Sequence, residues 1–144
     1  MPESSPATAE VTIKGAVSQV WDALVSPDKI KRYMFGADVV SDWKVGSPIV
    51  WRGEWKGKPF EDKGRILEIQ PGKRLRYSHF SPLSGEPDRP ESYHTVTIQV
   101  EGIDGEVHVD LSQDHAGDEK ARQESSRNWN MMLEGLKKTV ETGA

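Results

Sequence analysis

The hydrophobic positions near the start of the chain change from strand spacing to helical spacing. Residues 9–13 alternate between apolar and polar side chains, which predicts a β-strand. Residues 17–25 then carry apolar side chains at three- and four-residue steps, which predicts a helix with Ser18 as its N-cap. The Ser-Pro-Asp sequence that follows interrupts this helix, and we expect a second short helix from its N-cap Asp28 to about residue 34.

From residue 37 onwards the hydrophobic pattern has a period of two and is broken at intervals by glycine, proline and other turn residues. This pattern predicts a run of antiparallel strands at residues 38–43, 49–55, 60–69, 75–80, 93–100 and 107–113. Gly64 lies within one of these strands and indicates a bulge or a bend. Residues 81–90 contain three prolines and one glycine, so we expect a loop there.

The last part of the chain returns to helical spacing. Residues 117–142 are expected to form one long helix, with an apolar stripe made of Ala121, Ser125, Trp129, Met132, Leu133, Leu136 and Val140. A helix of roughly 25 residues is about 37 Å long, which is enough to lie across the predicted sheet. Because such a sheet curls, its apolar concave face needs a cover, and this helix is the element long enough to provide it.

The order of the predicted elements indicates an α+β fold. We expect a curved antiparallel β-sheet with two short helices and a long C-terminal helix across its concave face. Residues 9–144 are expected to form a single domain, and residues 1–8 a disordered tail.

Composition and charge narrow the classes of function. The 19 basic and 23 acidic side chains give a net charge of −4, which argues against binding to nucleic acid or to an anionic membrane. No stretch approaches the roughly 20 apolar residues of a membrane-spanning helix, and the N-terminal residues do not have the pattern of a signal peptide. The chain has no cysteine, which excludes disulfides, thiolate metal sites and a catalytic thiol. We therefore expect a soluble cytoplasmic protein.

Three groups of residues resemble a known family. They are residues 13–36, which combine a strand with the two short helices; residues 42–47, 64–69 and 73–77; and residues 129–138 in the last helix. In this order the segments are similar to the family of activator of heat-shock-protein-90 ATPase homologues, within the START and birch-allergen-like (SRPBCC) superfamily. The chain departs from the family pattern at Gly15 and Ala16, where a proline is more usual after the strand, and at Tyr33, where a tryptophan is more usual.

The resemblance implies a helix-grip architecture, which usually leaves a cavity between the terminal helix and the sheet. The side chains expected to face this cavity are Trp51, Trp55, Tyr77, His79, His94, Trp129 and Met132. An apolar lining with a few polar tips is typical of a small-molecule site. The alternative is that the same side chains fill the core, and the sequence leaves both interpretations open.

Two histidines are candidates for proton chemistry. His79 and His94 are predicted to lie on inward strand faces, where they could titrate or shuttle a proton, or could simply be satisfied core residues. No serine or carboxylate stands at a spacing that completes a nucleophilic set with them. Glu61 and Asp62 are adjacent in a strand and point to opposite faces, so we interpret them as solubilising charge.

A second set of titratable residues lies in the last strand. His108 and Asp110 share one strand face, and Asp114 and His115 follow closely. That face is opposite the apolar side of the strand and is expected to meet solvent. Because a metal site needs three or four converging ligands, no metal is expected, and no cofactor is predicted.

Three functions remain open at this point. The first is a non-catalytic module that binds a small hydrophobic ligand, and the residue pattern favours it. The second, which the resemblance implies, is an interaction protein that modulates the ATPase of a chaperone of the heat-shock-protein-90 type. The third is a cyclase- or hydrolase-like enzyme with a pocket histidine as its base. A monomer or a weak dimer is expected.

Overall fold

The computed structural model describes residues 6–34, 36–55, 57–81, 87–89, 92–115 and 118–142, apart from the side chain of Trp55. The elements are β1 (Ala7–Lys14), α1 (Val17–Val25), α2 (Pro27–Tyr33), β2 (Asp38–Ser41), β3 (Pro48–Trp55), β4 (Lys58–Gln70), β5 (Arg74–His79), β6 (His94–Ile103), β7 (Glu106–Gln113) and α3 (Glu119–Thr142). They confirm the predicted α+β helix-grip architecture.

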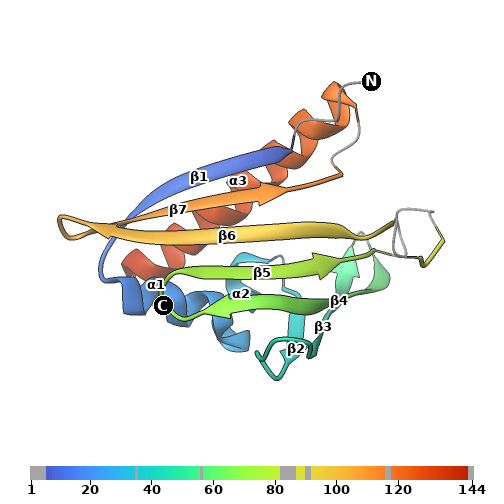
Figure 1. Ribbon diagram of the computed structural model, residues 1–144, viewed down its shortest axis with the longest axis horizontal. Coiled ribbons are helices and arrows are strands. Elements are labelled where there is room, and N and C mark those ends of the chain that lie inside the picture. The colour runs from blue at the N-terminus through green and yellow to red at the C-terminus, as the bar shows by residue number, and fades with distance from the viewer. Residues whose placement is uncertain are drawn as a thin grey trace.

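The strands form one antiparallel sheet with the order β1-β7-β6-β5-β4-β3-β2 (Figure 1). Consecutive strands from β2 to β7 are neighbours, whereas β1 pairs with β7, so α1 and α2 carry the chain from one edge of the sheet to the other. Buried residues of β1 are paired with buried residues of β7 in the register, for example Ile13 with Val107. This register places one continuous apolar face under α3.

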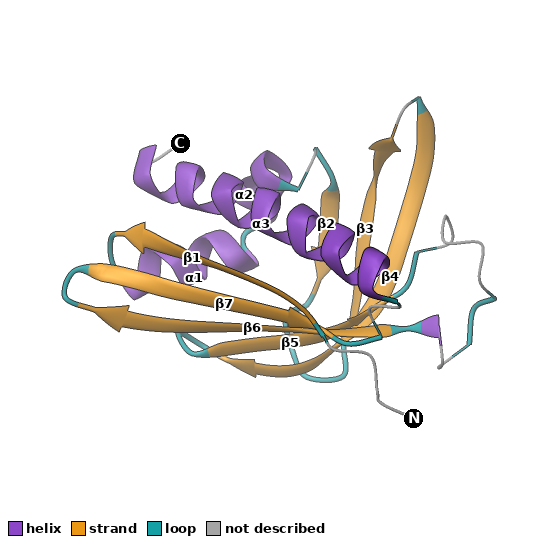
Figure 2. Cartoon of the chain, turned by 90° about the horizontal axis from the view of Figure 1, so that it is seen from above, coloured by secondary structure: helices purple, strands orange, loops and turns teal. Residues whose placement is uncertain are grey.

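The sheet bends sharply within the long strand β4. The register between β4 and β5 shifts between Ile66 and Glu68, as in a β-bulge. At Gly64 the backbone of β4 approaches β5 so closely that an added Cβ would lie 1.7 Å from the carbonyl oxygen of Ser78. The predicted bend at Gly64 is therefore confirmed, and Figure 2 shows β3 and the adjoining part of β4 standing up beside α3.

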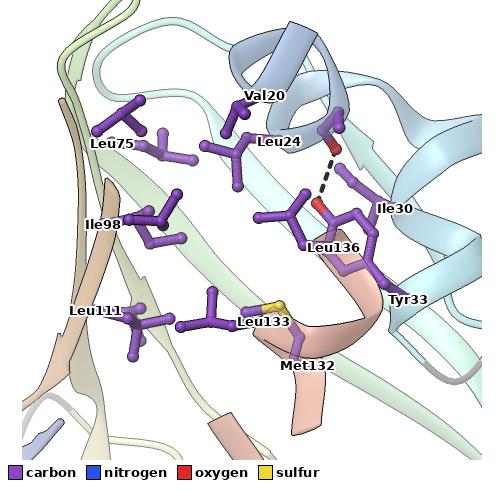
Figure 3. Packing of buried hydrophobic residues seen from close by; sticks show 14 of the residues in the cluster. Val20, Leu24, Ile30, Tyr33, Leu75, Ile98, Leu111, Met132, Leu133 and Leu136 are labelled. Atoms are coloured by element: carbon purple, nitrogen blue, oxygen red, sulfur yellow. Dashed lines mark hydrogen bonds between the residues drawn. The ribbon is translucent and has the colours of Figure 1, made fainter. Parts of the chain in front are cut away.

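The apolar stripe of α3 packs on the concave face of the sheet. Leu133 and Leu136 are fully buried, and Leu133 lies opposite Leu111 of β7 in Figure 3. Each such side chain stabilises the fold by roughly 1.5–3 kcal/mol through removal of apolar surface from water. The predicted clamp of the last helix on the sheet is confirmed.

The two short helices are tied to each other and to α3. The buried hydroxyl of Tyr33 donates a hydrogen bond to the carbonyl oxygen of Ala23, 2.7 Å away (Figure 3). Burial raises the pKa of this hydroxyl well above its ordinary value. α3 comes close to α2 at Gly135, where an added Cβ would lie 2.9 Å from that of Tyr33.

Both predicted helix caps are wrong. α1 begins after Ala16, and it is the side chain of Gln19 that accepts the backbone N–H of Ala16 at 2.9 Å, so Ser18 lies inside the first turn. α2 begins at Pro27, whose fixed φ suits the first helical position, and Asp28 follows within the first turn.

Other boundaries differ by a few residues. β1 begins at Ala7, so residues 7 and 8 belong to the sheet and not to the expected tail at residues 1–8, of which residues 1–5 lie outside the described residues. β2 ends at Ser41 instead of residue 43, because Trp43 has a φ of 57° and leaves the extended conformation. No helix in the described part of the chain is long and apolar enough to cross a membrane.

Candidate functional site

A cavity of about 330 Å³ lies between α3 and the raised strands β3 and β4. Its apolar wall is formed by Met34, Ala37, Trp51, Phe60, Trp129 and Met132. Its polar wall is formed by Asp62, His79, Gln113, Ser125 and Asn128. The bend of the sheet at β4 creates this space, because it lifts β3 away from the floor that α3 covers.

The deeper part of the interior is nearly filled by the residues that the structure describes. Only about 20 Å³ remains in the deeper part beneath α1, α2 and α3, where Leu75, Tyr77 and Ile98 point inward. Met34, Trp51 and Met132 line both spaces. Of the two interpretations of the inward aromatic residues, the filled core applies at the α1 end and the open cavity at the β3–β4 end.

Four of the seven candidate residues come together at the cavity. Trp51, His79, Trp129 and Met132 contribute to its wall, from β3, β5 and α3. The side chain of Trp55 lies outside the described residues.

The other two candidates lie beside the cavity. Tyr77 belongs to the filled interior, where its ring packs 5.2 Å from that of Trp51, and burial raises the pKa of its hydroxyl. His94 is opposite His79 in the β5–β6 register, and the two rings stack with centroids 6.4 Å apart. The two histidines therefore lie on the same face of the sheet, and of the two, His79 contributes to the described cavity wall.

The polar feature of the site is a pair formed by Asp62 and His79. The Nε2–H of His79 donates to Asp62 Oδ2 at 2.9 Å, and the side chain of Asp62 is 17% exposed. The second oxygen, Oδ1, is buried and has no hydrogen-bond partner in the described structure. The interpretation of Asp62 as solubilising charge is wrong.

The alternation of β4 contains the signal for Asp62. Glu61 points outward and pairs with Arg52 at 2.7 Å, whereas Asp62 shares the inward side with Phe60. Strand alternation alone could have placed Asp62 inside. Its partner His79 could not have been identified from spacing, because the two residues meet only through the pairing of β4 with β5.

Aromatic packing fixes the orientation of His79. The ring of Trp51 meets it edge-on, with centroids 5.1 Å apart and an interplanar angle of 70°.

His94, which stacks on His79, donates from Nδ1 to the carbonyl oxygen of Asp114 at 3.2 Å. Burial lowers the pKa of His94, and the Asp114 carbonyl partly offsets this effect.

Trp129 is fixed in the wall of the cavity by a hydrogen bond. Its indole Nε1–H donates to the Oε1 of Gln113 at 2.6 Å, and Gln113, at the end of β7, is itself buried. This bond ties the middle of α3 to the sheet and holds the indole in place in the cavity wall. The arrangement offers rigid aromatic surfaces next to one carboxylate, which suits binding of a small, mainly apolar molecule.

The histidine and carboxylates of the outer face also converge. His108 Nε2 lies 3.1 Å from Asp110 Oδ1 and 3.6 Å from Oε2 of Glu10, which reaches it from β1. Asp114 and His115 turn away, to the backbone N–H of Thr95 and the carbonyl of Tyr93 respectively. Glu10 and Asp110 are largely exposed, as expected for this face, and the absence of a metal remains a prediction.

Comparisons with known proteins agree with this architecture. The solution structure of ChR145 from Cytophaga hutchinsonii is similar with a TM-score of 0.86 and 52% identity, over 99% of this chain and 98% of that chain. The Aha1 dimer of Colwellia psychrerythraea gives a TM-score of 0.75 at 18% identity, over 96% and 98% of the two chains. The crystal structure of MLL2253 from Mesorhizobium loti gives a TM-score of 0.74 at 19% identity, over 95% of this chain and 98% of that chain. The last two likenesses concern the fold alone.

The family is established by the sequence as well. No functionally curated protein matches the chain. Residues 14–141, nearly the whole chain, match the family described as activator of Hsp90 ATPase homolog 1-like protein. This match and the 52% identity to ChR145 confirm the resemblance found in the sequence. The chain belongs to the family of activator of Hsp90 ATPase homolog 1-like proteins.

Proposed function

We propose that this protein binds a small hydrophobic ligand in the cavity between α3 and strands β3 and β4. The observation that carries the proposal is the contrast within one interior: the α1 end is filled, whereas about 330 Å³ stays open at the β3–β4 end. This volume is at the lower end of the roughly 300–1,000 Å³ typical of ligand pockets. The ligand is therefore expected to be small.

The walls suit an aromatic body. Trp51, Trp129 and Phe60 present flat apolar surfaces, and Met34 and Met132 add side chains that adapt to shape. The Trp129 indole is already fixed by Gln113, so little side-chain freedom is lost when a ligand packs against it.

A cavity-filling substitution tests the proposal. Ser125 lines the cavity from α3, and in the Ser125→Phe variant the new ring is expected to occupy the ligand space. We expect calorimetric titration with a panel of small aromatic and aliphatic compounds to show binding to the parent protein and at least a tenfold loss in this variant, which is about 1.4 kcal/mol.

The matched control is Met131→Phe, which adds a ring to the solvent side of the same helix, where Met131 is 60% exposed. This variant should bind as the parent does. If no compound of the panel binds the parent protein, or if Ser125→Phe binds as well as Met131→Phe, the proposed site is wrong.

Family membership supports a second candidate, an interaction with a chaperone of the Hsp90 type. The same variants separate the two functions, since Ser125→Phe should spare a protein–protein contact made through the outer surface. A chaperone ATPase rate that responds to the parent protein and to Ser125→Phe alike would support the second candidate independently of the first.

A further inference from the structure

We propose that the ligand of this cavity carries a hydroxyl group on an aromatic body, and that this hydroxyl donates a hydrogen bond to the carboxylate of Asp62. This inference rests on the proposed function, because it assigns the chemistry of the ligand that the cavity binds. It starts from the hydrogen-bonding capacity of Asp62, which the residues described in the structure leave mostly unused.

The Asp62 carboxylate has acceptor capacity to spare. An ionised carboxylate offers about four lone-pair sites, and the bond from His79 at 2.9 Å uses one of them. Oδ1 has no donor among the described residues although it is buried. A buried charged acceptor without a donor is costly, so a ligand that brings a donor gains more here than a purely apolar one.

The carboxylate is within reach of a ligand. Asp62 belongs to the cavity wall and its side chain keeps 17% of its surface exposed. The terminal torsion of an aspartate is soft, so a small rotation presents an oxygen to the cavity while His79 keeps its hydrogen bond. Trp51, Phe60 and Asp62 line the same cavity, so an aromatic body that packs against the two rings would bring its hydroxyl close to this oxygen.

A neutral donor fits better than a cationic one. An ammonium group would have to leave water for a wall made mainly of indole, phenyl and thioether groups, and this desolvation is expensive. Asp62 is the one carboxylate among the described residues of the cavity wall, and a single carboxylate offsets only part of this cost. A hydroxyl satisfies the same oxygen at a much smaller desolvation cost.

Three probes that share a naphthalene body test the inference: 2-naphthol, 2-methylnaphthalene and 2-naphthylmethylamine. Dissociation constants are measured by NMR titration of the full chain. Because a hydrogen bond to a charged group is involved, 2-naphthol should bind roughly tenfold to a hundredfold more tightly than 2-methylnaphthalene. It should also bind more tightly than the amine.

The variants are Asp62→Asn and Asp62→Leu. Asparagine keeps the shape and leaves a neutral acceptor, so the preference for 2-naphthol should fall several-fold. Leucine removes the acceptor, so the preference should disappear; if that variant does not fold, Asp62→Asn decides the question. Glu61→Gln is the control, since it makes the same chemical change on the outer side of β4, where Glu61 pairs with Arg52.

The outcomes separate this inference from the function beneath it. Equal binding of 2-naphthol and 2-methylnaphthalene, tighter binding of the amine, or a hydroxyl preference that survives in both Asp62 variants would overturn the inference and leave a hydrophobic-ligand site in place. If none of the three probes binds and the compound panel fails too, the proposed function itself is wrong.

Discussion

His79 and His94 are neighbours across β5 and β6, yet their surroundings give them different roles. His79 points its Nε2–H at the Asp62 carboxylate on the cavity wall. His94 is half-buried and donates from Nδ1 to the backbone carbonyl of Asp114. The carboxylate thus orients the histidine of the cavity, whereas burial lowers the pKa of the other.

The lowered pKa of His94 predicts a pH dependence of stability. Burial, the largest cause, disfavours the charged ring in the folded state, and the charges of His79 and His115 act in the same direction. Below the ordinary pKa of 6.5 the unfolded chain therefore binds more protons at this residue than the folded protein. The free energy of unfolding should fall as the pH drops through 6.5 and level off below the folded pKa.

Urea denaturation between about pH 7.5 and pH 5 measures this effect. In His94→Asn the amide can still donate to the Asp114 carbonyl but does not titrate, so the loss of stability on acidification should be smaller than in the parent protein. Equal pH profiles for the two proteins would show that His94 does not contribute.

Strand β4 is the element on which both the bend of the sheet and the candidate site depend. Its first part, residues 58–65, pairs with β3, and its second part, residues 66–70, pairs with β5. Gly64 lies near the point where the two pairings meet. The close approach of Gly64 to the Ser78 carbonyl leaves no room for a side chain. The same strand carries Asp62 two residues earlier, so the bend decides where the carboxylate lies.

Gly64→Ala is expected to destabilise the fold and to disturb the cavity. Relief of the clash with Ser78 requires movement of β4 away from β5, and overpacking of this kind costs roughly 1–3 kcal/mol. Urea unfolding measures the cost, with Leu67→Ala as a control because Leu67 is exposed on the same strand. Should Gly64→Ala be as stable as Leu67→Ala, the close approach of the two strands would be refuted.

The elements themselves could be predicted from the sequence because hydrophobic periodicity reports burial. The stripe of α3 and the alternation of β6 and β7 predicted these elements to within a few residues. Boundaries depend on local hydrogen bonds instead, as at Ala16 and Trp43, and periodicity does not describe them.

The candidate site could be predicted only in part, for a related reason. The sequence pattern predicts four of the cavity residues as inward positions of their own elements: Trp51, His79, Trp129 and Met132. The pair formed by Asp62 and His79 could not be predicted in this way, because it depends on the register of two strands and on the bulge between them. The division of the interior into a filled and an open part depends on how far β3 rises from the sheet.

At the scale of the whole molecule, the architecture divides into a nearly filled end and an open one. Under α1 and α2 the side chains of sheet and helices interlock and leave about 20 Å³. At the other end the first half of α3 faces raised strands across a space that the core does not fill. The proposed ligand would therefore bind at one end, away from the core that holds the fold together.

The central claim is that a ligand enters at the β3–β4 end, and the indole N–H signals in an ¹⁵N NMR spectrum report on it directly. On titration with 2-naphthol, the signals of Trp51 and Trp129 should shift together to saturation with a single dissociation constant. The signal of Trp21, on α1 at the filled end, should stay in place. Unshifted Trp51 and Trp129 signals, or equal shifts at Trp21, would contradict the account.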